Sequence, residues 1–382
     1  MVFLLLKTSY KIIMIKISFC IPVYNQTELV RQCIRSIIEY KGLDIEIVIS
    51  DDCSTENIEE LVRQIDDPRV RYYKNADNLG HDRNIIASFS RAKGEFVFLL
   101  RSRDKMIASQ IPCLIDAINR FPNASYITTS ALDEKKHGKI VYNENKVFEK
   151  GIQALKANNN LYVHPSGSAY KREMMDLKSI DQFIKKEVRS KFGFIVHNLM
   201  RIELSQKGDF VILKDFVWIY TTTTRAKDIA VNSQKNNQSV YSAELCRRRF
   251  SYEVKWCDLL LNDAMKIYQF EELFRIYLNQ CTWGYKLSNA NKKMRRHYNY
   301  EFVKINVKHE REEFIKYAKM LETKIICPDK RIGLDNRLNN IIKRNCREGY
   351  IKYLFLLVSE AFGFNNILIY ANMKLRYMRR LR

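Results

Sequence analysis

The sequence predicts an α/β fold, in which a mostly parallel sheet is flanked by helices, followed by a helical C-terminal extension. Two observations predict it. Over the first hundred residues, short apolar runs typical of buried strands alternate with amphipathic helical segments, the pattern of right-handed βαβ units. From about Ser239 the pattern is helical to the last residue. We therefore divide the chain into an α/β domain at 14–238 and a basic helical extension at 239–382, with the polar stretch Lys227–Ser239 as the boundary.

The elements of the α/β domain follow one another in a regular order. The predicted strands are the apolar runs Ile15–Ile21, Ile45–Ser50, Val70–Lys74 and Glu95–Leu100, with later strands at Tyr126–Ser130 and Phe210–Tyr220. The predicted helices between the first four strands are Thr27–Tyr40, Thr55–Ile65 and Asn84–Ala92. Because ligands of parallel sheets bind at the carboxyl ends of the strands, we expect the polar residues that follow these strands to lie together.

The composition narrows the class of protein. Hydrophobic residues make up 46% of the chain and charged residues 28%, as in a globular protein with a sizeable core. The nine cysteines form no CxxC pair, which favours reduced thiols over disulfides or a zinc site. We expect no secretory signal in residues 1–13, and no stretch reaches the ~18 uncharged apolar residues of a spanning helix. The net charge of +22 attracts anionic partners, but no nucleic-acid-binding motif accompanies it, so we expect no nucleic acid partner.

Four short motifs occur in order along the first hundred residues. They are Ile17-Ser-Phe-Cys-Ile-Pro-Val-Tyr-Asn25, Ile47-Val-Ile-Ser-Asp-Asp-Cys-Ser-Thr55, Asn78-Leu-Gly-His-Asp-Arg-Asn84 and Ala92-Lys-Gly-Glu-Phe-Val-Phe-Leu-Leu100. Together they resemble the nucleotide-binding half of the family 2 glycosyltransferases, which have the GT-A fold. The resemblance covers residues 15–106, weakens towards 255 and is absent beyond. It implies a nucleoside diphosphate sugar as donor, a polysaccharide or lipid-linked glycan as acceptor, and transfer with inversion.

The resemblance assigns donor-binding roles to residues of the first three motifs. Carboxylates at a strand end can accept hydrogen bonds from a pyrimidine N–H or from ribose hydroxyls, which suits Asp51 and Asp52 to a nucleoside. An alternative role for Asp52 is helix capping together with Ser54, and Gly80 has the alternative role of a turn glycine. The predicted nucleotide-sugar-binding residues of these motifs are Pro22, Tyr24, Asn25, Asp51, Asp52, Asn78, Gly80, Arg83 and Asn84.

The chain departs from the family after the strand Glu95–Leu100. The family carries an acidic cluster there, which holds Mg²⁺ or Mn²⁺ against the diphosphate. This chain has Arg101-Ser102-Arg103-Asp104, so only Asp104 remains as a metal ligand. Two interpretations stay open. Either Arg101 and Arg103 neutralise the leaving diphosphate in place of the metal and contact the donor together with Asp104, or the site is degraded and the protein is an inactive homologue that binds a partner.

An inverting transfer needs a base that takes the proton from the acceptor hydroxyl. The resemblance places this base within Phe192–Arg201, where His197 stands instead of a carboxylate. The unperturbed pKa of histidine, near 6.5, suits a base at neutral pH, so His197 is the predicted catalytic residue. Glu203 and Asp209 are weaker candidates, and a histidine that is simply packed or solvated is the alternative.

The segment His164-Pro-Ser-Gly-Ser168 resembles the family loop that faces the acceptor. This likeness implies acceptor contacts by His164, Ser166 and Gly167. The alternative is a plain turn before a helix that begins near Arg172.

Residues 341–382 combine basic and apolar segments. They hold nine Lys or Arg residues against two glutamates and so carry a net charge of +7. Apolar patches flanked by cations suit a segment that lies in a membrane interface near anionic lipid headgroups. This would place the protein in the cytoplasm, peripherally bound to the inner face of the cell membrane. Two alternatives stay open: a soluble helical subdomain with a solvated basic face, or an anionic-membrane-binding protein whose α/β domain is only a scaffold.

Overall fold

The computed structural model describes residues 14–160, 164–189, 193, 195–221 and 243–262, together with a few positions between 265 and 276. The predicted domain boundary at 227–239 and the basic segment 341–382 lie outside the described residues.

The described strands form one sheet in the order β3-β2-β1-β4-β9-β6-β10-β5, with β7 beside β6 and β8 beside β10. Their bounds are β1 Ile17–Val23, β2 Ile45–Asp51, β3 Val70–Lys74, β4 Phe96–Leu99, β5 Lys105–Met106, β6 Ala124–Asp133, β7 Gly138–Ile140, β8 Lys146–Phe148, β9 Ser168–Lys171 and β10 Asp209–Tyr220. Strands β1 to β4 run parallel to one another, as do β6 and β10, whereas β9 runs antiparallel to both of its neighbours. The predicted α/β fold with a mostly parallel sheet is therefore confirmed.

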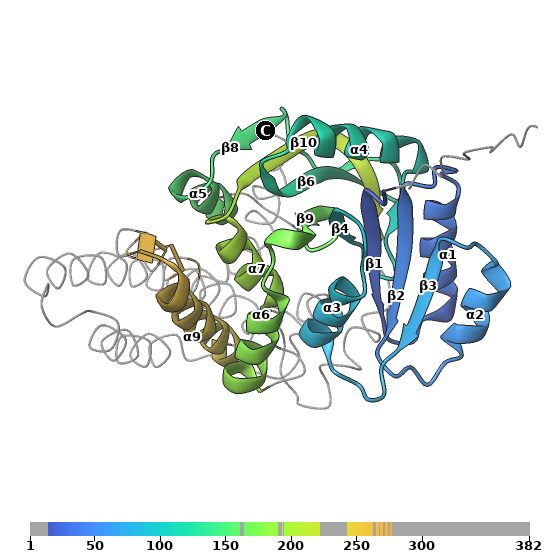
Figure 1. The fold of residues 1–382 in the computed structure, drawn as a ribbon, viewed down its shortest axis with the longest axis horizontal. Coiled ribbons are helices and arrows are strands. Elements are labelled where there is room, and N and C mark those ends of the chain that lie inside the picture. The colour runs from blue at the N-terminus through green and yellow to red at the C-terminus, as the bar shows by residue number, and fades with distance from the viewer. Residues whose placement is uncertain are drawn as a thin grey trace, which may run out of the picture.

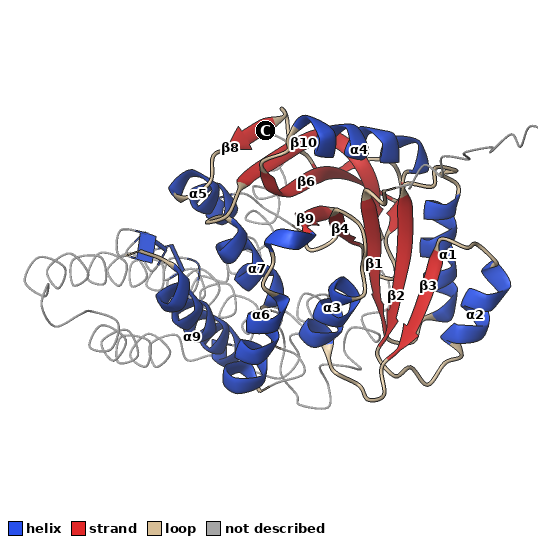
Figure 2. Cartoon of the chain, viewed as in Figure 1, coloured by secondary structure: helices blue, strands red, loops and turns tan. Residues whose placement is uncertain are grey.

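Helices cover both faces of the sheet (Figure 1). Their bounds are α1 Thr27–Ile38, α2 Ile58–Ile65, α3 His81–Ser90, α4 Ile111–Arg120, α5 Ile152–Asn160, α6 Leu177–Phe183, α7 Val196–Leu204 and α9 Ala243–Leu260. Short turns of other helix types lie at Ala108–Gln110, Arg172–Met174 and Ile184–Val188. Helices α1, α2 and α4 lie on one face, and α3, α5, α6 and α7 on the other, where α9 packs outside α7 (Figure 2).

Each face of the sheet has its own hydrophobic core, because successive side chains of a strand point to opposite faces. In β1, Ile17, Phe19 and Ile21 belong to the core beneath α1, α2 and α4. Cys20 of the same strand belongs to the core beneath α3, α6 and α7. The regular alternation fixes which strand residues each helix layer covers.

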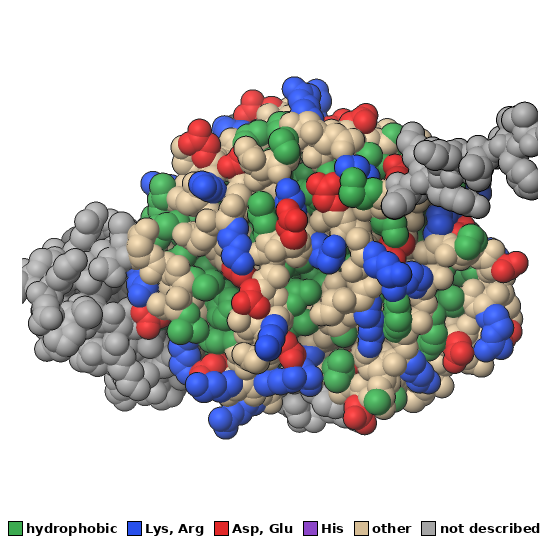
Figure 3. All heavy atoms as spheres, in the orientation of Figure 1, with side chains coloured by type: hydrophobic (Ala, Val, Ile, Leu, Met, Phe, Trp, Pro, Cys, Tyr) green, Lys and Arg blue, Asp and Glu red, His purple; other side chains and the backbone are tan. Residues whose placement is uncertain are grey.

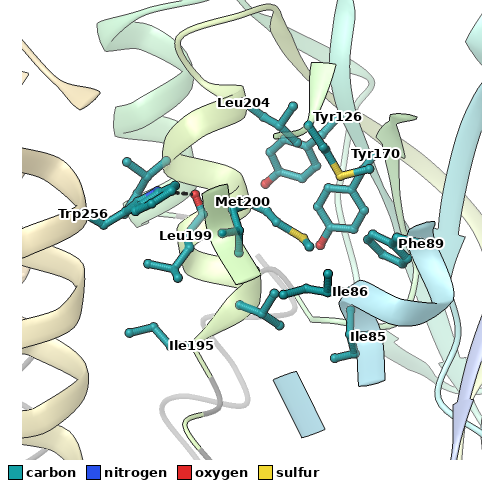
Figure 4. Packing of buried hydrophobic residues seen from close by; sticks show 14 of the residues in the cluster. Ile85, Ile86, Phe89, Tyr126, Tyr170, Ile195, Leu199, Met200, Leu204 and Trp256 are labelled. Carbon is teal, nitrogen blue, oxygen red and sulfur yellow. Dashed lines mark hydrogen bonds between the residues drawn. The ribbon is translucent and has the colours of Figure 1, made fainter. Parts of the chain in front are cut away.

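Aromatic and aliphatic side chains join α7 to the sheet and to α9 in the second of these cores (Figure 4). The rings of Tyr126 and Tyr170, on the adjacent strands β6 and β9, stack with their centroids 5.7 Å apart. On the outer side of α7, the indole N–H of Trp256 donates to the backbone carbonyl of Leu199 at 3.0 Å. The bond from Trp256 joins α9 to α7, which carries the predicted base.

The charged side chains on the face shown in Figure 3 form several small groups in which basic and acidic residues are interspersed. Within the part of the chain that the structure describes, no helix has the length and apolar character needed to cross a membrane.

Candidate functional site

The carboxyl ends of the parallel strands lie at one edge of the sheet. Val23 pairs with Asp51, and Asp51 with Lys74, so β1, β2 and β3 end level with one another. Because β9 is antiparallel, its first residue, Ser168, pairs with Leu99 near the end of β4. The loops that carry the predicted donor residues, and the loop before β9, therefore meet at this edge.

Asn25 ties the loop after β1 to the loop after β2. Its backbone has φ 58°, in the left-handed region that Asn tolerates better than most residues. Its Oδ1 accepts hydrogen bonds from the backbone N–H groups of Thr55 at 2.9 Å and Glu56 at 3.2 Å. Its own N–H donates to Ser54 Oγ at 2.8 Å. Pro22 and Tyr24 lie half-buried in the same segment, so these predicted donor residues belong to one braced pair of loops.

Asp51 is fully buried at the end of β2. Its Oδ1 accepts from the N–H of Ser54 at 2.9 Å, and its Oδ2 accepts from the Tyr72 hydroxyl at 2.7 Å. Burial and this carboxylate raise the pKa of Tyr72 well above its usual range, so the phenol remains a hydrogen-bond donor. Asp51 therefore braces β2 against β3 as well as lying at the predicted nucleoside site.

Asp52 holds the turn that precedes α3. Its Oδ1 accepts from Asn75 Nδ2 at 3.0 Å and from the N–H of Leu79 at 2.7 Å, and its Oδ2 accepts from the N–H of Gly80 at 2.9 Å. Helix α2 is capped by Asn57, so the alternative capping role of Asp52 is wrong. Three hydrogen bonds to one buried carboxylate fix the path of this turn.

The third motif supplies the predicted donor residues Asn78, Gly80, Arg83 and Asn84. Gly80 has φ 85°, which glycine adopts without strain, so its role as a turn glycine is supported. Asn84 is buried and exchanges two hydrogen bonds with Ser50, accepting from its Oγ at 2.7 Å and donating to its carbonyl at 3.0 Å. Arg83 Nε donates to Asp181 on α6 at 3.0 Å. These residues join the start of α3 to β2 and to α6.

Asp104 is fully buried, and its carboxylate accepts four hydrogen bonds. Oδ2 accepts from Arg101 Nε at 2.7 Å and Ser166 Oγ at 2.6 Å, and Oδ1 from Arg101 Nη2 at 2.8 Å and the N–H of Thr221 at 3.1 Å. A carboxylate has about four lone-pair sites, so these donors occupy all of them. The predicted metal ligand therefore does not fit Mg²⁺ or Mn²⁺. Within the described ranges, no group of three or more His, Cys, Asp or Glu side chains could hold a metal ion.

The guanidinium of Arg101 lies between Asp104 and an aromatic ring. Its central carbon is 4.8 Å from the ring centroid of Tyr220, at the end of β10. Burial disfavours the charge, but the Asp104 carboxylate outweighs burial and raises the pKa of Arg101. The donors with which Arg101 would grip a diphosphate in bidentate fashion are bound to Asp104. Arg103, the other predicted metal-replacing arginine, lies half-buried in the same turn.

The predicted acceptor residues pack together next to this ion pair. The N–H of Ser166 donates to His164 Nδ1 at 3.1 Å, and the His164 ring stacks on Trp218 with centroids 5.3 Å apart. Burial and the charge of Arg101 lower the pKa of His164 to about 3, so the imidazole is neutral. Gly167 has φ 83°, and a Cβ there would lie 1.9 Å from Trp218 Nε1. The segment leads into β9, and the short helical turn Arg172–Met174 follows that strand, so the predicted helix opening near Arg172 is present but β9 separates it from the segment.

His197 lies in the first turn of α7 and is almost fully buried. Neither ring nitrogen has a hydrogen-bond partner among the described residues. Burial, and after it the positive charges of neighbouring side chains such as Arg201, lower the pKa of His197 well below its usual range. The ring is therefore a weaker base than an exposed histidine.

The two weaker candidates for the base are held by other contacts. Glu203 accepts from Lys207 Nζ and from the N–H of Asp176. Asp209 begins β10, at the opposite edge of the sheet from the strand ends, and accepts from the N–H of Lys150. Both therefore serve the structure away from the predicted donor loops.

Two residues of the third motif that received no role in the sequence analysis belong to the site. His81 Nδ1 lies 2.8 Å from Asp82 Oδ1, and the His81 ring meets that of His197 edge to face with centroids 5.8 Å apart. The side chain of His81 is 34% exposed. The sequence signal for these two residues is that a histidine stands next to an aspartate within the third motif, which resembles the family.

Comparisons with known proteins agree with this geometry. Residues 18–177 match the model of the family described as glycosyl transferase family 2. Abequosyltransferase RfbV of Salmonella typhimurium is 39% identical over 103 residues, which cover 26% of this chain and 31% of that protein. The GalNAc(5)-diNAcBac-PP-undecaprenol beta-1,3-glucosyltransferase of Campylobacter jejuni is 24% identical over 213 residues, which cover 52% of this chain and 67% of that protein. The chain thus spans about a third of the first of these relatives.

Among solved structures, S. aureus TarS 1-349 in complex with UDP superimposes with a TM-score of 0.55 at 15% identity, over 88% of this chain and 91% of that one. A second structure of TarS 1-349 gives a TM-score of 0.51 at 15% identity, over 75% and 78%. At this identity the likeness concerns the fold alone. It confirms the predicted GT-A-like architecture.

Proposed function

Because the domain at residues 18–177 belongs to glycosyltransferase family 2, we propose that the protein transfers a sugar from a nucleoside diphosphate donor to a glycan acceptor of a bacterial surface polysaccharide, with inversion at the anomeric carbon. One observation carries the proposal. Hydrogen bonds of Asn25 and Asp52 join the loops after β1, β2 and β3 into one unit at the carboxyl edge of the sheet. Ligands of parallel sheets bind at such an edge, and the motifs typical of donor binding in the family form these loops.

The acceptor that we propose is a lipid-linked glycan. The name of the Campylobacter jejuni relative describes transfer to an undecaprenol-linked acceptor. The composition of residues 341–382 suits contact with the inner face of the membrane, where such an acceptor would be reached from the cytoplasm.

Calorimetric titration of UDP into the purified protein tests donor binding. UDP is the first probe because the similarly folded TarS was solved with UDP. We expect binding with Mn²⁺ and equally with excess EDTA, since Asp104 already accepts four hydrogen bonds from the protein. Binding that requires Mn²⁺ would mean that Arg101 gives way to a metal. No heat with UDP, CDP, GDP or dTDP would contradict the proposed function.

A pair of matched variants shows whether any binding uses the proposed loops. Asp52→Ala removes three hydrogen bonds to the turn before α3 and should weaken UDP binding. Asp77→Ala changes an exposed carboxylate in the same connection and should leave the affinity unchanged. Equal affinities of the two variants would place UDP elsewhere.

A second candidate function is a donor-binding homologue without transferase activity. The observation that favours it is the complete use of Asp104 by protein groups, because the residue that resembles a metal ligand is then a structural one. The two functions differ in one measurable property. A transferase releases UDP slowly from a UDP-sugar with water as acceptor, whereas an inactive homologue binds the donor without turnover.

A further inference from the structure

Asp82 is a buried carboxylate in the first turn of α3, with a side chain that is 1% exposed. It lies 2.8 Å from the ring nitrogen Nδ1 of the preceding residue, His81. On its other side it accepts from the N–H of Ile195, at 3.3 Å to Oδ1 and 3.2 Å to Oδ2. A Cβ at Gly193 would lie 2.6 Å from Oδ2, so the segment before α7 packs closely on the carboxylate. Asp82 is therefore fixed in position by backbone groups of a second element.

This arrangement sets the protonation of the His81 ring. An ionised carboxylate only accepts hydrogen bonds, so the ring carries its proton on Nδ1. Nε2 is then the basic nitrogen of the ring. A buried carboxylate that holds an imidazole in one tautomer and stabilises its cationic form is the arrangement that makes histidine an effective base.

His81 and His197 differ in access to solvent. The side chain of His81 is 34% exposed, whereas His197 is almost fully buried with neither ring nitrogen hydrogen-bonded to a described residue. The rings meet edge to face at an interplanar angle of 74°. His197, on α7, thus packs against a ring that is partly exposed. Both helices lie on the same face of the sheet and contact each other (Figure 2).

The start of α3 also lies beside the proposed donor loops. The N–H of Gly80, the residue before His81, donates to Asp52 at 2.9 Å, so His81 follows directly from the turn that Asp52 holds. Among the residues that the structure describes, Asp82 on α3 and His197 on α7 contact the His81 ring, and Arg83, the second residue after His81, pairs with Asp181 on α6.

We propose that His81, held by Asp82, is the general base of the transfer reaction, and that His197 positions it. This rests on the proposed function. The acceptor O–H proton passes to His81 Nε2 while the acceptor oxygen bonds to the anomeric carbon of the donor. The bond from that carbon to the phosphate oxygen breaks, its electron pair leaves with the nucleoside diphosphate, and the imidazolium then returns its proton to water. His81 is the catalytic residue, and Asp82 and His197 act through it.

The test measures UDP release from UDP-glucose, UDP-galactose and UDP-N-acetylglucosamine with water as acceptor, beside calorimetric binding of UDP. His81→Ala should lower turnover by about 10²–10⁴-fold, the range for loss of a general base, while UDP affinity stays close to that of the native protein. Added imidazole should restore part of the lost turnover. Asp82→Asn should lower the pH at which turnover reaches half its maximum, because it removes the negative charge that stabilises the imidazolium, and it should reduce the plateau because the imidazole is then a weaker base. His137→Ala, which changes an exposed histidine that also lies near an aspartate, Asp133, is the matched control.

The results distinguish failure of the proposed base from failure of the proposed function. If the native protein fails to bind UDP or the other nucleoside diphosphates, the proposed function fails. If UDP binds but His81→Ala keeps native turnover and pH profile, while His197→Gln loses them, His197 is the base and this inference is overturned. The ¹⁵N shifts of His81 give a test without any donor sugar. A proton on Nδ1 supports the inference, and a proton on Nε2 contradicts it.

Discussion

Arg101 donates two hydrogen bonds to Asp104, from Nε at 2.7 Å and from Nη2 at 2.8 Å. The two residues stand where the family resemblance implies a metal. In place of a metal cation bound by several carboxylates, this chain has a guanidinium bound by one carboxylate. The positive charge is covalently part of the chain, so it needs no bound ion to be present. As a consequence, the two N–H groups with which Arg101 could bind a phosphate point at Asp104 and not towards a ligand.

The first prediction concerns the stability that this pair provides. Asp104→Asn should lower the free energy of unfolding by about 3–5 kcal/mol, because it leaves a largely buried guanidinium without its counter-charge. Chemical denaturation measures the loss. Glu59→Gln removes one partner of an exposed ion pair with Arg63 and should cost less than about 1 kcal/mol. Similar losses in the two variants would show that the buried pair contributes no more than a surface one.

The second prediction concerns Arg103. Arg103→Ala should weaken UDP binding by about tenfold or more, the effect of losing one charged hydrogen bond to a phosphate. Calorimetric titration measures the dissociation constant. Arg120→Ala changes an arginine at the end of α4, just before β6 begins and so at the opposite edge of the sheet, and should have no effect. Tighter binding after Arg103→Ala, or metal-dependent binding after Arg103→Asp alone, would favour a degraded metal site.

The third prediction is a pH dependence of stability caused by buried neutral histidines. The pKa of His164 is about 3 in the folded protein, against about 6.5 in an unfolded chain. Between these values the unfolded state binds more protons, so the free energy of unfolding falls as the pH falls. Each such histidine contributes a slope of up to about 1.4 kcal/mol per pH unit, and His197, whose pKa is also lowered, adds to it.

Denaturation at pH 7, 6 and 5 measures this slope. His164→Asn should reduce it by about 1 kcal/mol per pH unit, because one group no longer takes up a proton on unfolding. His137→Asn, at an exposed histidine, should leave it unchanged. The carboxylates with lowered pKa, such as Asp67 and Asp176, act only at lower pH, so they do not obscure this window. An unchanged slope in His164→Asn would mean that His164 is charged in the folded protein.

The fourth prediction concerns the basic end of the chain. Changing Arg379, Arg380 and Arg382 to Glu should abolish flotation with vesicles that contain anionic phosphatidylglycerol, because each cation contributes about 1 kcal/mol to binding an anionic surface. UDP binding should remain. Flotation of the native protein with neutral phosphatidylcholine vesicles is the control. If the native protein fails to float with anionic vesicles, the proposed membrane contact is wrong, and a solvated basic face is the better interpretation.

The strands and helices of the first hundred residues could be predicted because β1, β2 and β4 are mostly apolar runs followed by polar residues, and amphipathic helical segments lie between the strands. Strand β9 could not be predicted in this way. It has only four residues, Ser168–Lys171, and its buried Ser168 and Ala169 give no apolar signal. It is buried because β4 and β6 pair with it on both sides, which is a property of the assembled sheet.

The candidate site, like the sheet, could be predicted only in part from the sequence. Motif spacing places Asp52 at the carboxyl edge, but its partners Leu79 and Gly80 lie 27 and 28 residues further along the chain. The opposite charges of Arg101 and Asp104, three residues apart, could have suggested an ion pair. Ser166 and Thr221, which complete the bonds to Asp104, come from distant segments that only the fold brings near. Residue types therefore located the site, and long-range hydrogen bonds decided what each residue does there.

The last prediction concerns Gly167, at the turn into β9. Gly167→Ala should destabilise the protein by more than the ~1–2 kcal/mol that a left-handed backbone costs an ordinary residue, because the new methyl group would lie 1.9 Å from Trp218 Nε1. Gly151→Ala is a matched control, since Gly151 has φ +92° but nothing within 4 Å of the position that a methyl group would take. The difference between the two free energies of unfolding isolates the contact with Trp218. Equal losses would show that the indole moves aside, and His164, which stacks on that indole, would then move with it.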